Sequence, residues 1–209
     1  MRTPGWPATL SHAPVVVRPL TARDARVWQQ VRERNLEWLL PWDATAPPQA
    51  DARPVSYAEL ARRLRREAAA GRAMPFALEV EGRFAGQVTV SNIVRGSAQF
   101  ASIGYWIDRD VAGRGLMPLA VAMVIDHCLG AGRLHRIEVC IRPENTNSLR
   151  VVEKLGLAEV GFAPGYLHID GAWRDHRIYA VTAEELEGGL VQRLVARRGP
   201  DDKSHSSHE

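Results

Sequence analysis

Apolar residues recur along this chain with the spacings of short strands and of helices. The segments that read as strands are residues 15–17, 76–80, 84–93, 100–107, 134–141, 162–169 and 173–181. Glu81-Gly82 and Asp170-Gly171 separate two pairs of these segments, and such dipeptides indicate tight hairpin turns. Strands that alternate with helices favour an α/β or α+β sheet over an all-helical or all-β protein.

Four segments between or before these strands have helical spacing or helix-start signals. We expect helices at residues 21–36, 57–70, 116–129 and 145–156. Thr21, Ser56 and Asn145 are suitable N-caps, and Gly156 is a suitable C-terminal stop. The four prolines of residues 41–54 predict a loop, and the charged segment from Glu184 is expected to be helical at first and then disordered.

Length and charge point to one soluble domain without an obvious polyanionic partner. The chain has 209 residues and a net charge of +3, so we expect one domain at residues 14–183, with flexible termini at 1–13 and 184–209. No basic stripe with interleaved aromatic residues and no membrane-length apolar run is visible, so neither nucleic acid nor membrane binding is expected. Cys128 and Cys140 lack metal spacing, and the N-terminus lacks a signal-peptide pattern; we therefore expect a cytoplasmic protein without a bound metal.

The most informative segment is a glycine turn between a strand and an apolar helix. Gly113-Arg114-Gly115 stands directly before the helix expected at 116–129. Free N–H groups and the dipole at a helix N-terminus attract phosphate, glycine permits close approach to the backbone, and Arg114 adds a cation. The turn is neither a P-loop nor a dinucleotide fingerprint, since no Gly-Lys-Ser/Thr and no third glycine follows. An ordinary strand-to-helix connection remains the alternative.

A second motif follows one strand later. Asn145 and Ser148 begin the fourth expected helix in the pattern Asn-x-x-Ser…Lys-x-Gly-Leu, which ends at Leu157. Together with the glycine turn, this motif resembles the GNAT superfamily of acetyl-CoA-dependent N-acetyltransferases. The segments 18–25, 35–42 and 166–176 extend the resemblance toward both ends of the chain. The last two are similar to the Rim-type branch, which acetylates the N-terminal amine of ribosomal proteins.

The resemblance implies a fold and a cofactor. The fold is a mixed, mostly antiparallel sheet of six to seven strands, flanked by helices and splayed between two central strands. The cofactor is acetyl-CoA, held between these strands. The residues that the resemblance assigns to cofactor binding are Trp106, Ile107, Asp108, Ala112, Gly113, Arg114, Gly115, Leu116, Met117, Asn145 and Ser148.

The catalytic groups are less clearly indicated. Many relatives protonate the departing thiolate with a tyrosine where this chain has Val152, whereas Rim-type relatives use the serine that matches Ser148. A helix-capping role is the alternative for Ser148. Rim-type relatives often carry an acidic residue at the position of Gly165, so Glu138 is the best remaining candidate base. Glu138 could instead form a salt bridge with Arg136. In that case Asp175, His176 or water would serve as the base.

The acceptor is expected to be a protein or peptide N-terminus, with a ribosomal protein as candidate partner and a monomer or homodimer as the assembly. Trp42, Asp43, Tyr105 and Tyr166 are the expected substrate residues, and Asp43 is placed to pair with an α-ammonium group. Trp38 and Trp173 are further aromatic candidates, although core packing explains most single tryptophans. Two alternatives stay open: acetylation of a small amine, and acyl-CoA binding without catalysis.

Overall fold

The computed structural model describes residues 3–48, 50 and 56–198, and it contains one sheet of eight strands in the order β1-β2-β3-β4-β5-β6-β8-β7. The strands are β1 (Leu10–His12), β2 (Val15–Pro19), β3 (Met74–Val80), β4 (Arg83–Val94), β5 (Phe100–Ile107), β6 (Arg136–Ile141), β7 (Ala158–Ile169) and β8 (Ala172–Thr182). All neighbours are antiparallel except β5 and β6, which are parallel. The expected mixed, mostly antiparallel sheet is therefore confirmed, with eight strands where six to seven were expected.

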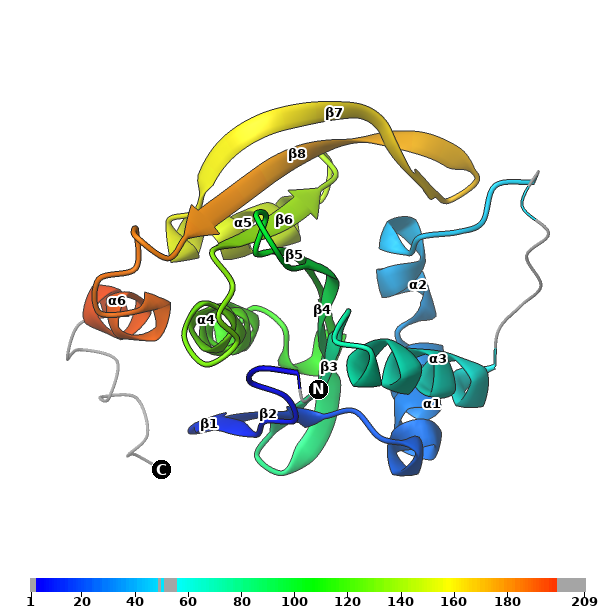
Figure 1. Ribbon diagram of the computed structural model, residues 1–209. Coiled ribbons are helices and arrows are strands. Elements are labelled where there is room, and N and C mark those ends of the chain that lie inside the picture. The colour runs from blue at the N-terminus through cyan, green and yellow to red at the C-terminus, as the bar shows by residue number, and fades with distance from the viewer. Residues whose placement is uncertain (1–2, 49, 51–55, 199–209) are drawn as a thin grey trace, which may run out of the picture.

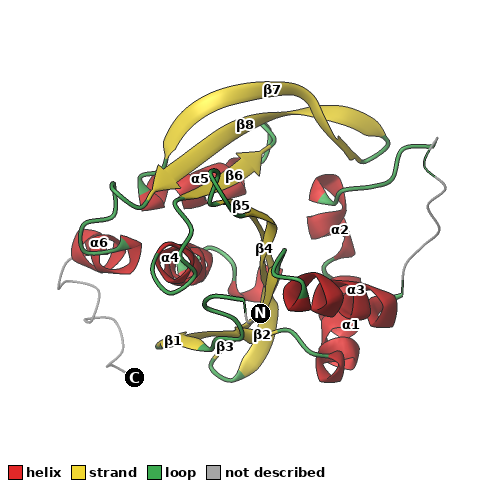
Figure 2. Cartoon of the chain, viewed as in Figure 1, coloured by secondary structure: helices red, strands yellow, loops and turns green. Residues whose placement is uncertain are grey.

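Helices cover both faces of this sheet (Figures 1 and 2). They are α1 (Ala25–Arg34), α2 (Leu36–Leu39), α3 (Tyr57–Ala69), α4 (Leu116–Leu129), α5 (Thr146–Leu155) and α6 (Leu190–Arg198), with the 3-10 turns η1 (Ala22–Asp24), η2 (Leu40–Trp42) and η3 (Arg109–Val111). The helices α1, α2 and α3 lie on one side of β3 and β4, and α4 and α6 lie on the other (Figure 1). The β7–β8 hairpin arches over the end of the sheet nearest α2 and α5 (Figure 1).

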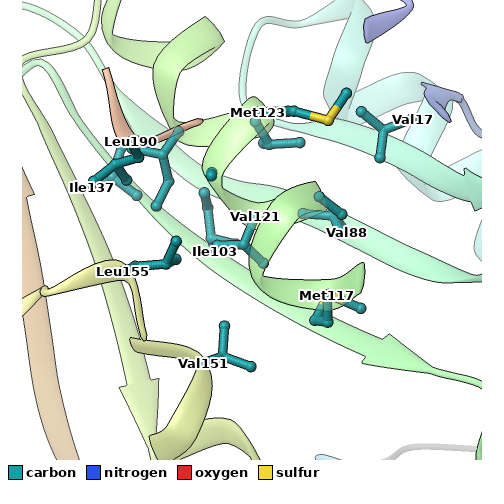
Figure 3. Packing of buried hydrophobic residues seen from close by; sticks show 14 of the residues in the cluster. Val17, Val88, Ile103, Met117, Val121, Met123, Ile137, Val151, Leu155 and Leu190 are labelled. Atoms are coloured by element: carbon teal, nitrogen blue, oxygen red, sulfur yellow. The ribbon is translucent and has the colours of Figure 1, made fainter. Parts of the chain in front are cut away.

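The apolar helix α4 forms the centre of the core. Its residues from Leu116 to Ile125 are all buried, which explains why apolar residues surround this helix instead of forming one stripe. Figure 3 shows Met117 and Val121 of α4 beside Val88 of β4 and Ile103 of β5. Val151 and Leu155 of α5 and Leu190 of α6 complete the same cluster. The cofactor motifs at the starts of α4 and α5 are thus anchored by the protein's main core.

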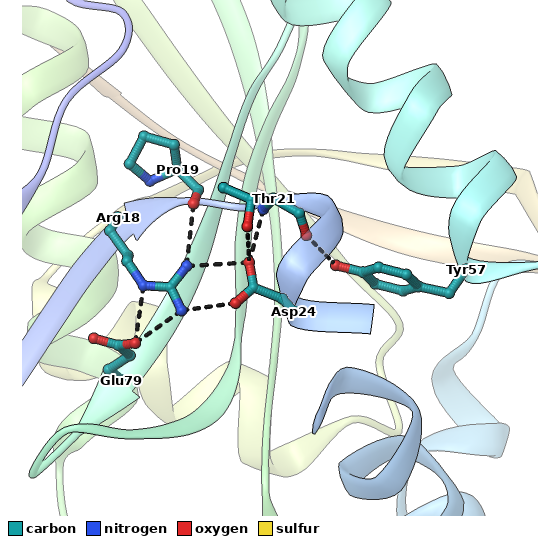
Figure 4. A network of polar contacts seen from close by, with 6 residues as sticks. All are labelled: Arg18, Pro19, Thr21, Asp24, Tyr57 and Glu79. Carbon is teal, nitrogen blue, oxygen red and sulfur yellow. Dashed lines mark hydrogen bonds and ion pairs between the residues drawn. The ribbon is translucent and has the colours of Figure 1, made fainter. Parts of the chain in front are cut away.

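A polar network fixes the second helical layer to the sheet (Figure 4). Arg18 of β2 pairs with Asp24 of η1 at 2.7 Å and with Glu79 of β3 at 2.8 Å. Asp24 also accepts hydrogen bonds from the backbone N–H and the hydroxyl of Thr21, and Tyr57 of α3 donates to the Thr21 carbonyl. Burial raises the pKa of Asp24, but these hydrogen bonds outweigh it and hold that pKa below its usual range.

Several strands begin or end a few residues away from the expected positions, and the larger differences lie in the first helix and at the two termini. The helix expected at 21–36 is divided into η1, α1 and α2, because buried Asn35 ends α1 and donates its side-chain N–H to the Val31 carbonyl. At the N-terminus, β1 pairs with β2 and the Trp6 ring packs against Phe76 at 5.0 Å, so residues 3–13 contact the domain. At the C-terminus, Asp126 accepts hydrogen bonds from Leu190 and Val191 at the start of α6. Of the proline-rich segment, residues 49 and 51–55 lie outside the described part, as does the tail from 199 onward.

The two central strands separate, as expected. β5 and β6 pair only at Phe100–Arg136, Ala101–Ile137 and Ser102–Glu138, although β5 continues to Ile107. β4 remains paired with β5 as far as Ile107. The last half of β5 therefore keeps one neighbour and loses the other, which leaves main-chain groups available on the open side.

Candidate active site

A cavity of about 670 Å³ lies beside the free half of β5. Its walls come from α2, η2, β4, β5, the turn before α4, and α5. The lining residues are Trp38, Leu39, Trp42, Asp43, Gln87, Thr89, Gly104, Tyr105, Trp106, Ile107, Arg109, Ala112, Gly113, Gly115, Leu116, Met117, Pro118, Asn145, Asn147, Ser148, Arg150, Val151 and Lys154. Both sequence motifs and part of the expected acceptor site therefore open into one space.

The glycine turn has the backbone geometry that close contact with an anion requires. Gly113 and Gly115 have φ angles of 79° and 74°, a conformation that favours glycine. A Cβ atom on Gly113 would meet nothing within 4 Å, so the backbone at Gly113 faces open space. Leu116 and Met117 form the first turn of α4, where N–H groups have no acceptor within the helix. The turn can therefore donate several hydrogen bonds toward one anion.

Cationic side chains lie along the same part of the cavity. Arg150 and Lys154 of α5 and Arg109 of η3 line it. Together with the main-chain donors of the turn, these three cations fit the phosphates of coenzyme A. We call this part, formed by residues 109–118 and 145–154, the cofactor half of the cavity.

Two expected cofactor residues face elsewhere. Asp108 is buried, pairs with Arg34, and accepts a hydrogen bond from Asn35 at 2.8 Å. Asn35 also accepts from the Arg109 N–H at 2.9 Å, so Asp108 and Asn35 join α1 to the end of β5. Arg114 is half-exposed and lies 3.5 Å from Glu81. Neither Asp108 nor Arg114 lines the cavity.

Ser148 faces the cavity with its hydroxyl uncommitted to capping. Asn145 caps α5, because its side-chain oxygen accepts from the Ser148 N–H at 3.1 Å. Among the described residues, the Ser148 hydroxyl makes no hydrogen bond. Asn145, and not Ser148, therefore caps α5. Tyr105 donates its hydroxyl to the Ser148 carbonyl at 3.3 Å, and burial raises the pKa of this tyrosine. Tyr105 thereby holds α5 against β5 at this point.

The other part of the cavity is lined by aromatic and polar side chains from separate elements, and we call it the acceptor half. It consists of Trp38, Leu39, Trp42, Asp43, Gln87, Thr89, Gly104, Tyr105, Trp106 and Ile107. Trp106 and Ile107, at the end of β5, are the two of these that were expected to contact the cofactor. Asp43 is the one carboxylate among the described lining residues, and it is paired with Arg32. The Arg32 guanidinium lies 5.6 Å from the Trp28 ring and 5.3 Å from the Trp106 ring. The two rings hold the Arg32 guanidinium in place, and the guanidinium in turn orients the Asp43 carboxylate.

The segment that carries Trp42 and Asp43 is held in place by Arg142, just after β6, and by the end of β7. Arg142, just after β6, donates to the Pro41 carbonyl at 2.7 Å, and its guanidinium lies 5.4 Å from the Trp42 ring. Thr45 donates its N–H to the His168 carbonyl at 2.8 Å, beside a β-bridge between Ala44 and Ile169. The β7–β8 hairpin therefore braces the segment after η2 through main-chain contacts, without lining the cavity itself.

Several other expected residues lie outside the cavity. The carboxylate of Glu138 pairs with Arg136 at 2.7 Å, because Glu138 sits where β6 is still paired with β5. Tyr166 lies on the arching part of β7, 5.3 Å from His176. Its hydrogen bond with Cys140 and partial burial raise the pKa of Tyr166 to about 12. Neither residue belongs to the cavity lining.

The remaining candidates of the hairpin are occupied within it or exposed. Asp175 accepts a hydrogen bond from the Gly165 N–H at 2.8 Å, and buried His176 contacts the Arg174 carbonyl through Nδ1 at 3.0 Å. Trp173 is 59% exposed. None of the three lines the cavity.

Gln87 and Thr89 also line the cavity and were not among the expected site residues. A signal was present, because these two polar residues alternate with Val88 and Val90 in the middle of β4. The cations Arg109, Arg150 and Lys154 were also missed, since exposed positive charge on helices is common and carries little information.

Comparison with known proteins agrees with this geometry. The acetyltransferase (GNAT) domain family matches residues 15–158. RimJ of Mycobacterium smegmatis, solved in complex with CoA-disulfide, is 40% identical with a TM-score of 0.87, and the match covers 95% of this chain and 98% of that chain.

Two further relatives are also N-acetyltransferases, and they match this chain over different lengths. The ribosomal protein uS5-alanine N-acetyltransferase of Escherichia coli (strain K12) is 30% identical over 84% of this chain and 91% of its own length. The probable N-acetyltransferase YjcK of Bacillus subtilis (strain 168) is 40% identical, but the match spans only 48% of this chain and 56% of that protein. The chain therefore belongs to the GNAT family of acetyl-CoA-dependent N-acetyltransferases and closely resembles RimJ-type ribosomal uS5-alanine N-acetyltransferases.

Proposed function

We propose that this enzyme acetylates the N-terminal α-amine of a protein, and that the acceptor is a ribosomal protein with a small first residue. The observation that carries the proposal is the acceptor half of the cavity, where Trp38, Trp42 and Trp106 line the same space as Asp43, the one carboxylate among the described lining residues. An α-ammonium group would be attracted by both the carboxylate and the aromatic faces. The uS5-alanine activity named for the E. coli relative favours the same acceptor class.

Three groups would share the work of the reaction. Asp43 holds and orients the amine, which must lose a proton before it attacks the thioester. Water takes this proton, since no other carboxylate or histidine lines the cavity in the described residues. The Ser148 residue also lines the cavity; its hydroxyl supplies a proton to the departing thiolate and regains one from water.

The walls of the acceptor half favour a small first residue. Trp38 donates its indole N–H to the Ile107 carbonyl at 3.1 Å, and Trp42 is stacked by Arg142, so both rings are held in place. A large first side chain would have to displace one of these rings or move the amine. Misplacement of a reacting amine by ~1 Å can cost ~10²-fold in rate. Alanine and serine are therefore the expected N-terminal residues.

A peptide screen tests the proposal. Thiol release from acetyl-CoA would be followed with peptides that differ only in the first residue, and with polyamines and free amino acids as small-amine acceptors. We expect the highest kcat/KM for peptides that begin with Ala or Ser. Efficient turnover of small amines with no turnover of any peptide would overturn the proposal and leave the family and cofactor unchanged. Acetyl-CoA binding without turnover of any acceptor would favour a non-catalytic acyl-CoA-binding role.

A further inference from the structure

A short chain of hydrogen bonds runs from α1 into the acceptor half. Trp28 of α1 donates its indole N–H to the side-chain carbonyl of Gln87 at 3.0 Å. Gln87 of β4 donates its side-chain amide to the hydroxyl oxygen of Thr89 at 2.8 Å. Gln87 is only 8% exposed, while Thr89 is partly exposed and lines the cavity. This series of hydrogen bonds therefore starts in the protein interior and ends at the acceptor half of the cavity.

The chemistry of the first residue sets the direction of every hydrogen bond in this chain. An indole N–H can only donate, so the facing atom of Gln87 must be its carbonyl oxygen. The amide nitrogen of Gln87 then faces Thr89 and must donate to it. Thr89 accepts that hydrogen bond and keeps its own proton to donate elsewhere. No acceptor for this proton is found among the described residues.

The surroundings of Thr89 leave room for a ligand atom. Thr89 pairs across the sheet with Gly104 of β5, which also lines the cavity. A Cβ atom on Gly104 would meet nothing within 4 Å, so space is open beside the hydroxyl. On the opposite face of β4, Val88 and Val90 are fully buried in the core, which fixes the strand and hence the direction of Thr89.

We propose that Thr89 determines acceptor specificity by donating its hydroxyl proton to the first carbonyl oxygen of the peptide. This inference rests on the proposed function, because a peptide N-terminus, unlike a polyamine, has a neutral amide carbonyl next to the reacting amine. With the amine at Asp43, that carbonyl remains in the acceptor half and needs a donor once water is displaced. Trp28 and Gln87 are positioning residues that keep the Thr89 proton directed at the cavity.

Such a donor separates peptides from simple amines. A peptide satisfies the Thr89 proton, whereas an amine without a carbonyl leaves it unpaired in a partly desolvated site. Sites built to hydrogen-bond a substrate group discriminate against analogues that lack it, because the buried protein group then has no partner. The expected preference is about 10-fold in kcat/KM, since one neutral hydrogen bond contributes roughly 0.5–1.5 kcal/mol.

The test compares two acceptors across matched variants. One acceptor is a peptide that begins with Ala, and the other is the same peptide with its first carbonyl replaced by a methylene group. We expect the wild-type enzyme to prefer the carbonyl peptide about 10-fold. Thr89→Val keeps the side-chain shape and removes the hydroxyl, so the preference should fall to about 1. Thr89→Ser restores the hydroxyl and should restore the preference.

Two further variants separate direction from mere polarity. Gln87→Glu replaces the amide donor by a carboxylate that accepts from both Trp28 and Thr89. The Thr89 proton then turns away from the cavity, and at pH 8 the preference should be lost although the hydroxyl remains. Ser91→Ala removes a hydroxyl from the same face of β4 at a position outside the cavity lining, and it should keep the preference. The KM for acetyl-CoA and the melting temperature report whether each variant is folded.

Each outcome of this test bears on one part of the proposal. An unchanged preference in folded Thr89→Val, with peptide turnover intact, would overturn the role of Thr89 and leave the proposed function standing. If Thr89→Ser lost the preference for the carbonyl peptide, or if Gln87→Glu kept it, the assigned direction of the hydrogen bonds from Trp28 to Thr89 would be overturned. Absence of peptide turnover by the wild-type enzyme would overturn both this inference and the proposed function.

Discussion

The two halves of the cavity are built in different ways. The cofactor half comes from two continuous segments, residues 109–118 and 145–154, and much of it is main chain. The acceptor half gathers side chains from α2, η2, β4 and β5, and residues of α1, β6 and the β7–β8 hairpin brace it without lining it. Recognition by backbone groups needs only a turn and a helix start, whereas recognition by side chains needs several distant elements to meet.

The electrostatics of the halves differ in the same sense. The helix N-terminus and three cationic side chains make the cofactor half positive, and the share from the helix N-terminus does not depend on side-chain placement. In the acceptor half the carboxylate of Asp43 is partly balanced by Arg32, which is itself stacked near Trp28 and Trp106. We therefore expect mutations in the cofactor half to act locally and mutations in the acceptor half to act through neighbours.

The largest effect is expected at the glycine turn. Gly113→Val places a branched side chain at φ 79° in the open space where phosphates would bind. Loss of about two charged hydrogen bonds would weaken acetyl-CoA binding by roughly 10²-fold or more. Titration calorimetry with acetyl-CoA measures this loss.

Gly96→Val is the matched control for that variant. Gly96 has a φ of 71° and open space around its Cβ position, but it lies in the β4–β5 turn away from the cavity. Both variants should lower the melting temperature by roughly 2–8 °C, because a left-handed non-glycine residue costs about 1–2 kcal/mol. Equal weakening of acetyl-CoA binding in both variants would show that strain, and not the blocked turn, is responsible.

The next effect is on catalysis at Ser148. Ser148→Ala should lower kcat on the order of 10²-fold and leave the KM for acetyl-CoA nearly unchanged, since the hydroxyl acts as an acid and not as a cap. Stability should change little, whereas Asn145→Ala should lose about 1 kcal/mol because Asn145 makes the cap. Steady-state kinetics and urea unfolding distinguish the two. An unaltered kcat in Ser148→Ala would remove the serine from the reaction.

A smaller effect is expected at Asp43. Asp43→Asn should raise the KM for peptide by roughly 10-fold, less than for an unpaired carboxylate, because Arg32 already shares its charge. The KM for acetyl-CoA should stay constant, since Asp43 lies in the acceptor half. A larger change in the acetyl-CoA KM than in the peptide KM would contradict the division of the cavity into two halves.

A stability effect is expected at Asp108, which joins α1 to the end of β5. Burial raises the pKa of Asp108, but hydrogen bonds from Arg34 and Asn35 outweigh it and hold that pKa below its usual range. A carboxyl with a lowered folded-state pKa stabilises the protein above its unfolded pKa of about 4, and this contribution is lost as the pH falls through the folded-state value. Asp108→Asn should therefore destabilise by about 1–3 kcal/mol at pH 7 and flatten the loss of stability below about pH 4.

Urea unfolding at pH 7 and pH 3 tests this expectation. Asp175→Asn is the control, since Asp175 is exposed in the hairpin and accepts a single backbone hydrogen bond. If Asp108→Asn and the wild-type protein lose the same free energy of unfolding between the two pH values, the buried carboxylate does not cause acid sensitivity.

The smallest effect is expected at Glu138. Glu138→Gln breaks the ion pair with Arg136 outside the cavity, so kcat/KM and its pH profile should match those of the wild-type enzyme. Disappearance of the acidic limb of the pH profile would make Glu138 the base after all.

Local sequence patterns predicted the elements well where one signal sufficed. The strand at 100–107 and the helix at 116–129 have the expected bounds, and Gly156 ends α5 with a φ of 68°. The break at Asn35 was not predictable, because α1 and α2 share helical spacing and only the contact of Asn35 with Asp108 and Arg109 divides them. Likewise, alternation correctly placed Glu138 on one face of β6, but Arg136, two residues away, decides what its carboxylate meets.

The sequence by itself determined the family and the cofactor, and it predicted that the glycine turn and the start of α5 share one site, because glycine turns, caps and helix starts are encoded within a few neighbouring residues. Only the tertiary structure decided which aromatic and polar side chains form the acceptor half. Trp28, Arg32, Asp43, Gln87 and Thr89 meet through the packing of α1 and the loop after η2 onto β4 and β5. Side-chain contacts between residues so far apart in the chain depend on the relative positions of whole elements, and no local pattern records those positions.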